Sequence, residues 1–308
     1  MSVSSLNATF AECIEIFLHH MANHRRVAPN TIAAYHNDLR QFAEYLEEWC
    51  AEHPGLSLES LQISELDAGS LSGFVLRMRE KGYAQATVAR KIAAVKSLFH
   101  YATEEGLVRE NPAALLDSPR VRRAMPRSAS PADVQALLEF GCAGEGSDNQ
   151  RNRAMLTLLY HSGMRVGEVV ALDTSDLDLA AGVVYCRGRS GRARTIPLPA
   201  VAHEALSEYL EEGRPLLVRG GASEDPALFL NHRGTRLTRQ GFWLIMRDRA
   251  REAGIQAPIT PHTLRHSFAY QHLDNGTALR ELKELLGHMN ISTTQMYTLA
   301  EEPVAASF

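Results

Sequence analysis

The first hundred residues carry apolar side chains at intervals of three and four, which is the spacing of one helix face. Pro29 stands where one of these stretches begins, and proline suits the first turn of a helix. Helices with short connections pack as a compact bundle, so we expect an α-helical N-terminal domain over residues 7–105. The predicted helices span residues 10–21, 29–49, 63–78 and 85–102.

The second half of the chain mixes helical spacing with a β signal. Two short apolar stretches, 182–186 and 195–198, flank a glycine-bearing turn and predict an antiparallel hairpin. Residues 228–230 predict a further short buried strand. We therefore expect a mostly helical domain with a small antiparallel sheet over residues 128–308, after a proline-bearing linker at 106–127. One of its predicted helices begins after Ser130. The others span residues 151–162, 201–210, 238–253 and 279–286.

Polar side chains fall on consecutive helix ends near the C-terminus. His262 and Arg265 are three residues apart, so on a helix they share a face. Gly287 is expected to end the helix over 279–286 as a left-handed cap. His288 then stands just past that end, where a side chain is displayed and not packed.

A short helix is expected to begin at Ser292, because Ser292 and Gln295 match a capping box, and to carry Tyr297. Guanidinium groups match phosphate oxygens bidentately, and imidazoles donate to the same oxygens or move a proton. A phenol, with a pKa of about 10, is a weak nucleophile that needs a cationic clamp beside it. Taken singly, a His–Arg pair is usually a solvated helix face and a tyrosine half-buried packing. Together they favour phosphoryl transfer to a tyrosine.

Three motifs carry a family resemblance. H-T-L-R-H occupies residues 262–266, and L-L-G-H at 285–288 is followed after eight residues by Tyr297. An upstream H-S-G-M-R motif supplies Arg165, with Glu168 three residues later as a candidate ion-pair partner. This set resembles the tyrosine recombinases of the phage integrase family, most closely the Xer-type enzymes. The resemblance spans nearly the whole chain.

The resemblance implies a site-specific enzyme that cuts and rejoins double-stranded DNA through a 3′-phosphotyrosyl intermediate, with neither metal nor ATP. Tyr297 would attack the scissile phosphate. Arg165 and Arg265 would hold the non-bridging oxygens, and His288 would donate to one of them. His262 would take the phenol proton. The N-terminal bundle would be the core-binding, SAM-like half of a DNA clamp.

Arg189 departs from the family pattern, which has a lysine at this place in the hairpin to protonate the leaving 5′ oxygen. Arginine holds its proton too tightly for a good general acid, although it still stabilises negative charge. No lysine lies between Lys96 and Lys283 to replace it. Either Arg189 substitutes imperfectly, or water or another group is the acid, or the protein cleaves slowly.

Composition narrows the setting only slightly. The net charge of −4 argues weakly against a nucleic-acid partner. Net charge is a poor guide here, however, because the basic residues are concentrated in particular stretches of the chain. The cysteines show no paired spacing, which favours free thiols in a reducing cytoplasm. No run of eighteen apolar residues occurs, so no membrane span is expected. The cysteines are Cys13, Cys50, Cys142 and Cys186.

The expected partners are a specific DNA site and further recombinase subunits. Clustered arginines at 120–123 favour a linker that crosses the duplex. By resemblance, the subunits form a homo- or hetero-tetramer on DNA in which C-terminal tails are exchanged between neighbours. The candidate phosphate contacts are Arg25, Arg26, Lys91 and Lys96 in the bundle and Arg236, Arg239, Arg247 and Arg249 in the second domain.

Two rival functions stay open at this point. A type IB topoisomerase uses similar chemistry but relaxes supercoils without pairing two sites. A DNA-binding relative with weak catalysis is made thinkable by Arg189. The sequence also leaves open whether the role is chromosome-dimer resolution, element integration or transposon resolution.

Overall fold

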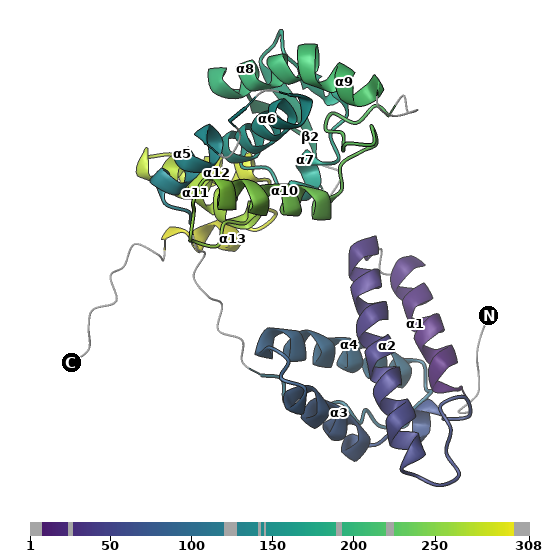
Figure 1. Cartoon of the computed structure of the whole chain (residues 1–308). Coiled ribbons are helices and arrows are strands. Elements are labelled where there is room, and N and C mark those ends of the chain that lie inside the picture. The colour runs from purple at the N-terminus through teal and green to yellow at the C-terminus, as the bar shows by residue number, and fades with distance from the viewer. Residues whose placement is uncertain are drawn as a thin grey trace. The chain divides into compact units, whose positions relative to one another are not determined.

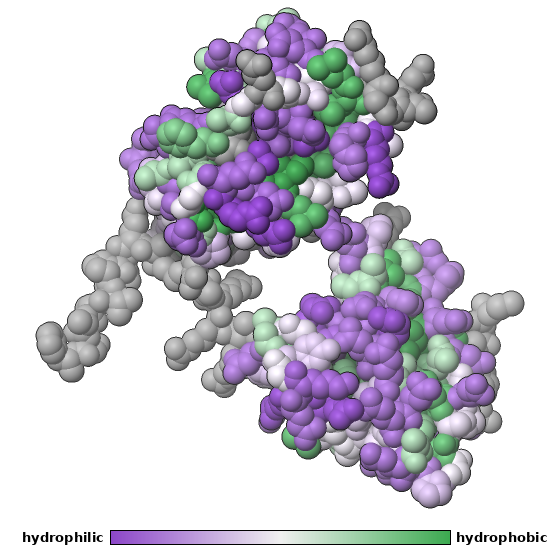
Figure 2. All heavy atoms as spheres, in the orientation of Figure 1, coloured by the Kyte–Doolittle hydropathy of each residue, from purple (hydrophilic) through white to green (hydrophobic). Residues whose placement is uncertain are grey.

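The structure is a computed structural model that describes residues 8–23, 27–119, 128–140, 143–144, 146–188, 193–219 and 225–298. The chain divides into two compact units, Met1–Arg123 and Ala124–Phe308. The described residues are mostly helical with one small antiparallel sheet, so the predicted fold class is confirmed. Figure 2 shows hydrophilic side chains over most of the visible face of each unit, with hydrophobic ones in small separate areas.

The first unit contains the four predicted helices with small changes of boundary. The stretch predicted as one helix over 63–78 is divided, because the Asp67 carboxylate accepts a hydrogen bond from the Ser70 backbone at 2.8 Å and starts a new helix there. Residues before Asp67 form a separate 3-10 turn. The elements are α1 (Phe10–Asn23), α2 (Pro29–Ala51), η1 (Ile63–Glu65), α3 (Ala68–Glu80) and α4 (Gln85–Glu104).

Two predictions about this unit need correction. Lys91 is not a phosphate contact, since it is buried and its Nζ donates to the Asp38 carboxylate at 2.9 Å. Residues Leu107 and Leu116, placed in the linker from sequence, pack in the core of this bundle. Lys96 is half-buried, and its role as a contact stays a prediction. Arg25, Arg26 and the basic segment 120–123 lie outside the described residues.

The second unit is built around one buried helix, α6 (Ser147–Ser162). Its apolar residues face all sides, and Met155, Leu156 and Leu159 are fully buried, as expected of a helix with neighbours all round. Figure 1 shows α8 and α9 on one side of α6, and α11, α12 and α13 grouped on the other. The surrounding helices are α5 (Pro131–Glu139), α7 (Val166–Val169), α8 (Ala200–Glu208), the π-helical turn η3 (Tyr209–Gly213), α9 (Arg214–Arg219), α10 (Arg239–Glu252), α11 (Pro261–Asp274), α12 (Leu279–Leu286) and α13 (Ser292–Gln295).

The sheet confirms the predicted hairpin and adds a strand. β2 (Val183–Arg187) and β3 (Ala193–Pro197) pair antiparallel, with Val184 opposite Ile196. β1 (Leu177–Asp178), which follows the 3-10 turn η2 (Thr174–Asp176), pairs antiparallel with β2 in the order β1-β2-β3. Residues 228–230 are buried as predicted, but the prediction of a strand is wrong: this part of the chain makes only isolated bridges, at Ala227 and Leu230.

Two expectations from composition concern the cysteines and membrane-spanning helices. Cys13, Cys50 and Cys186 are buried free thiols, as predicted, while Cys142 lies outside the described residues. No helix in the described ranges is long and apolar enough to cross a membrane.

Candidate active site

The C-terminal end of α12 is the point on which the site is built. A helix end leaves its last four carbonyl groups without partners inside the helix. Here the chain turns back at Gly287, whose φ of +62° is the left-handed conformation that glycine adopts without strain. The backbone N–H groups of Gly287 and His288 donate to the carbonyls of Glu284 and Lys283, each at 3.0 Å. The predicted glycine cap is confirmed, and the next carbonyls remain available.

Three arginines from three different elements donate to the next three carbonyls of this helix end. Arginine is suited to the position, because the C-terminal end of a helix carries partial negative charge. The guanidinium groups therefore converge on one point, immediately before His288. The pairs are Arg194 Nε with Leu285 O at 3.1 Å, Arg265 Nη2 with Leu286 O at 2.6 Å and Arg165 Nη2 with Gly287 O at 3.3 Å.

Glu168 joins two of these arginines. Its carboxylate accepts from Arg165 through both the backbone N–H at 2.8 Å and Nη1 at 3.0 Å, so the predicted Arg165–Glu168 pair is present. Arg194 donates to the same two oxygens, at 3.2 and 2.8 Å. Burial alone would raise the pKa of Glu168, but the hydrogen bonds and charges of the two arginines lower it to about 2. Glu168 is therefore ionised throughout the neutral range.

Arg265 is the most deeply placed of the three arginines, with 5% of its surface exposed. Its Nη1 donates to the carbonyl of Gly163, the residue that ends α6, so the guanidinium bridges two helix ends. Burial, together with the nearby charge of Arg165, lowers the pKa of Arg265 to about 10. The group stays charged at neutral pH and keeps its planar fork fixed.

His288 and His262 occupy different environments. His288 is half-buried, and its Nδ1 lies 3.0 Å from the Thr294 hydroxyl on α13. Burial, followed by the charges of Arg265 and Arg165, lowers the pKa of His288 to about 4, so the imidazole is neutral at pH 7. If the Thr294 hydroxyl donates to Nδ1, the ring proton sits on Nε2 and is the one offered to a ligand. His262 is exposed on the first turn of α11.

Tyr297 lies just beyond α13, with only 1% of its surface exposed. Its hydroxyl is 2.8 Å from Nδ1 of His266, one turn along α11 from His262. Burial raises the pKa of the phenol, while the positive charges of Arg265 and Arg165 act on it in the opposite direction. The nucleophile candidate thus feels the field of both predicted phosphate ligands.

His266 is a site residue that the sequence reasoning missed, although it stands inside the quoted motif H-T-L-R-H. The four-residue spacing from His262 was the available signal, because residues i and i+4 share a helix face. The predicted capping box at Ser292 is wrong: the cap position is Ile291, no side chain caps the helix there, and Ser292 is its first residue.

The other candidate basic residues of the second unit differ in their surroundings. Arg189 lies outside the described residues. Arg236, Arg247 and Arg249 each form ion pairs with acidic neighbours. Arg239 is exposed at the start of α10, against Gly167, where an added β-carbon would come within 2.6 Å of the Arg239 Nε. Because Gly167 has no side chain, the Arg239 guanidinium can lie against the backbone there, and Gly167 is only two residues after Arg165 in the sequence.

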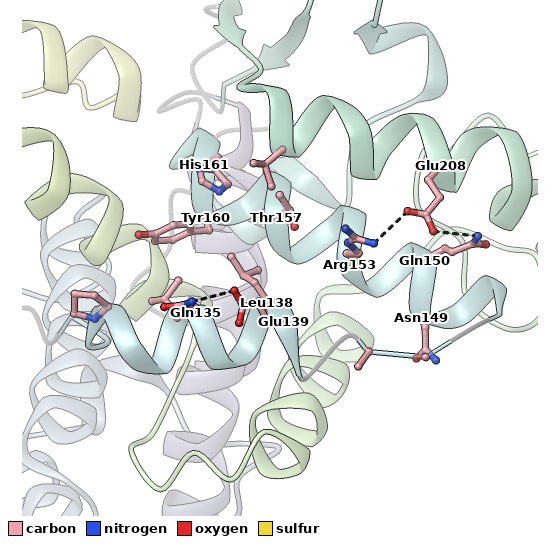
Figure 3. A pocket seen from close by; sticks show the side chains of 15 residues that line it. Gln135, Leu138, Glu139, Asn149, Gln150, Arg153, Thr157, Tyr160, His161 and Glu208 are labelled. Atoms are coloured by element: carbon pink, nitrogen blue, oxygen red, sulfur yellow. Dashed lines mark hydrogen bonds and ion pairs between the residues drawn. The ribbon is translucent and has the colours of Figure 1, made fainter.

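A separate cavity of about 590 Å³ lies between α5, α6 and α8 (Figure 3). Its lining includes ion pairs and amide contacts, such as Arg153 with Glu208 at 3.3 Å and Gln150 with Glu208 at 3.4 Å. Arg165, Arg265 and Tyr297 are not among its lining residues. This hollow is therefore distinct from the arginine cluster.

Comparisons with known proteins agree with the geometry. Residues 127–302 match the model of the phage integrase family, and residues 14–106 match the phage integrase N-terminal SAM-like domain. The tyrosine recombinase XerC of Roseiflexus castenholzii is 46% identical over 287 residues, covering 93% of this chain and 88% of the relative. The tyrosine recombinase XerD of Listeria monocytogenes is 40% identical over 292 residues, covering 93% of each.

Solved structures share the fold. The Tn1549 transposon integrase in complex with a circular intermediate DNA superposes with a TM-score of 0.70 at 19% identity, over 92% of this chain and 94% of that chain. Both units thus have counterparts in one protein.

Proposed function

We propose, since the chain belongs to the phage integrase family of tyrosine recombinases, that Tyr297 is the nucleophile with which this site-specific recombinase cuts DNA. The phenolic oxygen forms a bond to the scissile phosphorus, and the bond from phosphorus to the 5′ oxygen breaks. The ester energy stays in the 3′-phosphotyrosyl bond, so a 5′ hydroxyl from a partner strand can reverse the step without ATP. The convergence of Arg165 and Arg265 on one helix end beside His288 is the observation that carries this proposal.

The arrangement suits the charge that develops during cleavage. Arg165 and Arg265 hold the two non-bridging oxygens, and His288 donates from its Nε2–H to one of them. Donors that are already fixed in position stabilise developing charge without reorganising during the reaction. The helix end fixes both guanidinium groups by hydrogen bonds, and Thr294 fixes the imidazole.

The phenol proton has two imidazoles near it. We assign proton removal to His262, which is exposed at the start of α11 and stands one turn from the phenol's present partner. His266 holds the hydroxyl in the resting protein and is a weak base, because burial, with the charges of His262 and Arg265, lowers its pKa to about 4. At the leaving 5′ oxygen, Arg189 takes the place of the family's lysine. An arginine there stabilises negative charge but donates its proton poorly.

Double-stranded DNA with a recombination site is the proposed substrate, so the enzyme would act in the cytoplasm. Arg239 is the phosphate contact favoured by its exposed position beside α7. Exchange needs two cut duplexes, so we propose a tetramer in which C-terminal tails are passed between neighbours. Removing residues 301–308 should then weaken the pairing of two sites while leaving binding to one site intact.

The test is trapping on a nicked DNA substrate that loses its 5′ hydroxyl after cleavage. The parent protein should form a covalent adduct that survives denaturing electrophoresis, and Tyr297→Phe should bind the same DNA without forming one. An adduct in Tyr297→Phe would refute the assignment. Libraries of genomic fragments would supply the unknown site, and sequencing the attached strand would identify it.

A type IB topoisomerase would also form the adduct, so a second assay is needed. The relatives described above are recombinases, which favours exchange between two sites. Plasmids carrying two copies of the identified site should recombine, and relaxation of supercoils without exchange would support the topoisomerase alternative. Whether the exchange resolves chromosome dimers or moves an element would follow from where the site lies.

A further inference from the structure

Arg194 completes the arginine cluster with Arg165 and Arg265 at the end of α12. It lies on β3, and its side chain is 14% exposed. Its guanidinium makes three hydrogen bonds, one to the Leu285 carbonyl and two to the Glu168 carboxylate. Through them β3 is tied to both α7 and the end of α12, the two elements that position Arg165.

The bonds to Glu168 determine how much charge Arg165 can offer to a phosphate. Each carboxylate oxygen of Glu168 accepts one bond from Arg165 and one from Arg194. The single negative charge is therefore shared between two guanidinium groups. Without Arg194, the carboxylate would pair with Arg165 alone and neutralise its charge more completely. Glu168 could then also rotate and turn the Arg165 guanidinium out of position.

The charge of the whole cluster fits the reaction. Arg165, Arg194 and Arg265 with Glu168 leave two positive charges uncompensated within this group of four. When a phenolate attacks a phosphodiester, the charge on the two non-bridging oxygens approaches two units in the transition state. Removing Arg194 would lower the available charge and misplace the donor that delivers it.

Arg194 is also packed closely against the helix end. A β-carbon on Gly287 would lie 2.7 Å from Arg194 Nη1, so the guanidinium fills the space that a side chain there would need. This contact and the bond to the Leu285 carbonyl fix the segment that leads into His288.

We propose that Arg194 is a positioning residue for DNA cleavage: it holds Glu168 and the end of α12 so that Arg165 presents an uncompensated guanidinium to the scissile phosphate. Arg194 touches the reacting atoms only through Arg165. It is unsuited to replace the missing lysine as a proton donor. Burial alone would lower its pKa, but the hydrogen bond and charge of Glu168 raise it above the ordinary value for arginine.

This inference rests on the proposed function, so the parent protein must first form the Tyr297 adduct. The experiment is a double-mutant cycle on single-turnover cleavage, with Arg165→Ala, Arg194→Ala and both together. Arg165→Ala should cost about 100- to 1000-fold, as expected for loss of one transition-state donor. Arg194→Ala should cost about 100-fold through misplacement of that donor, while its affinity for the DNA site stays within about twofold of the parent.

The double variant decides between coupling and independence. If Arg194 acts through Arg165, the double variant should cleave no more slowly than Arg165→Ala alone. Losses that multiply would overturn the proposal, as would an unchanged rate in Arg194→Ala. Failure of the parent to form any adduct would refute the proposed function instead, so the two failures are distinguishable.

A second substrate separates positioning from general loss of structure. Replacing one non-bridging oxygen of the scissile phosphate by a methyl group removes the charge that Arg165 offsets. The cost of Arg194→Ala should shrink on this substrate as much as that of Arg165→Ala. A cost that is the same on both substrates would mean that Arg194 only supports the fold.

Arg214 supplies the matched control, because its guanidinium also binds backbone carbonyls, those of Asp225 and Ala227, away from the cluster. Arg214→Ala should lower the melting temperature and leave the cleavage rate of the folded protein unchanged on both substrates. Arg194→Lys, which keeps the charge but has no fork to bind both carboxylate oxygens, should fall between the parent and Arg194→Ala. A rate equal to that of Arg194→Ala would mean that charge sharing contributes nothing.

Discussion

Nδ1 of His266 lies 2.8 Å from the hydroxyl of Tyr297, inside a cluster that also includes Phe268 and Leu286. The phenol is 1% exposed, so a DNA phosphate cannot reach it in this arrangement. If Tyr297 is the nucleophile, as proposed, Tyr297 must move before cleavage and exchange its contact with His266 for one with the phosphate. The two histidines of α11 should consequently have separable effects.

We expect His262→Ala to slow cleavage by about 100- to 10,000-fold, the usual contribution of a general base, while DNA binding is kept. His266→Ala should instead release the phenol. The measurement is nitration of tyrosine followed by mass spectrometry: Tyr297 should be protected in the parent and react in His266→Ala. Tyr185, which is 44% exposed, should react in both and serves as the internal control. Equal protection of Tyr297 in the two proteins would show that the contact does not hold the ring.

The stability of the second unit should fall on mild acidification. Burial is the main reason that the pKa values of His266 and His288 are about 4, against 6.5 for an ordinary histidine. Between these values the unfolded chain binds more protons than the folded one, so stability is complete above pH 6.5 and is lost as the pH falls towards 4. Glu168, with a pKa of about 2 against 4.5, adds a further loss below pH 4.5.

This pH dependence can be measured by tryptophan fluorescence, because the chain has only two tryptophans, Trp49 and Trp243. In Trp49→Phe, urea unfolding reported by Trp243 should give a falling free energy from pH 7 to pH 4. Replacing His266 and His288 together by glutamine should reduce the slope above pH 4.5, while His161 and His272, whose pKa values burial also lowers, keep part of it. An unchanged slope in that variant would assign the acid sensitivity to other groups.

Helix spacing and local caps allowed most of the fold to be predicted. The α12 boundaries, the cap at Gly287 and the β2–β3 hairpin depend on contacts within a few residues, and the spacing of apolar and turn residues records such contacts. The division at Asp67 and the absence of a capping box at Ser292 depend on which side-chain bonds form at a helix start: Asp67 accepts one from the Ser70 backbone, and no side chain caps α13. Sequence alone does not rank those bonds.

The site itself was only partly visible in the sequence. Arg165, Arg265, His288 and Tyr297 could be singled out because their spacing follows a known motif. Arg194 and His266 were missed because their importance comes from partners far along the chain, such as Glu168 for Arg194 and Tyr297 for His266. Lys91 was misassigned for the same reason, since its partner Asp38 lies on another helix.

Arg239 should contribute one phosphate contact to DNA binding. Arg239→Ala should weaken binding to every DNA sequence to a similar degree and reduce the salt dependence of log K by about 0.9, the value for one neutralised phosphate. Gly167→Ala should act in the same direction, because the new β-carbon would displace the guanidinium. Arg153→Ala is the control, since Arg153 pairs with Glu208 in the separate cavity. Titrations over a range of salt concentrations check this, and an unchanged slope in Arg239→Ala would contradict it.

Lys91 should stabilise the N-terminal bundle without touching DNA. Its Nζ is buried with Asp38, and leaving a buried carboxylate uncompensated costs about 3–5 kcal/mol. Because Arg90 also pairs with Asp38, the loss on removing Lys91 should lie below that range. In a Trp243→Phe background, urea unfolding followed at Trp49 should show such a loss for Lys91→Met and a smaller loss for Lys91→Met combined with Asp38→Leu. DNA affinity at a temperature where the bundle is folded should stay unchanged in both. Lys96→Ala, in contrast, should weaken DNA binding and leave the unfolding free energy within about 0.5 kcal/mol of the parent. A drop in affinity for folded Lys91→Met would restore the phosphate-contact assignment that its burial argues against.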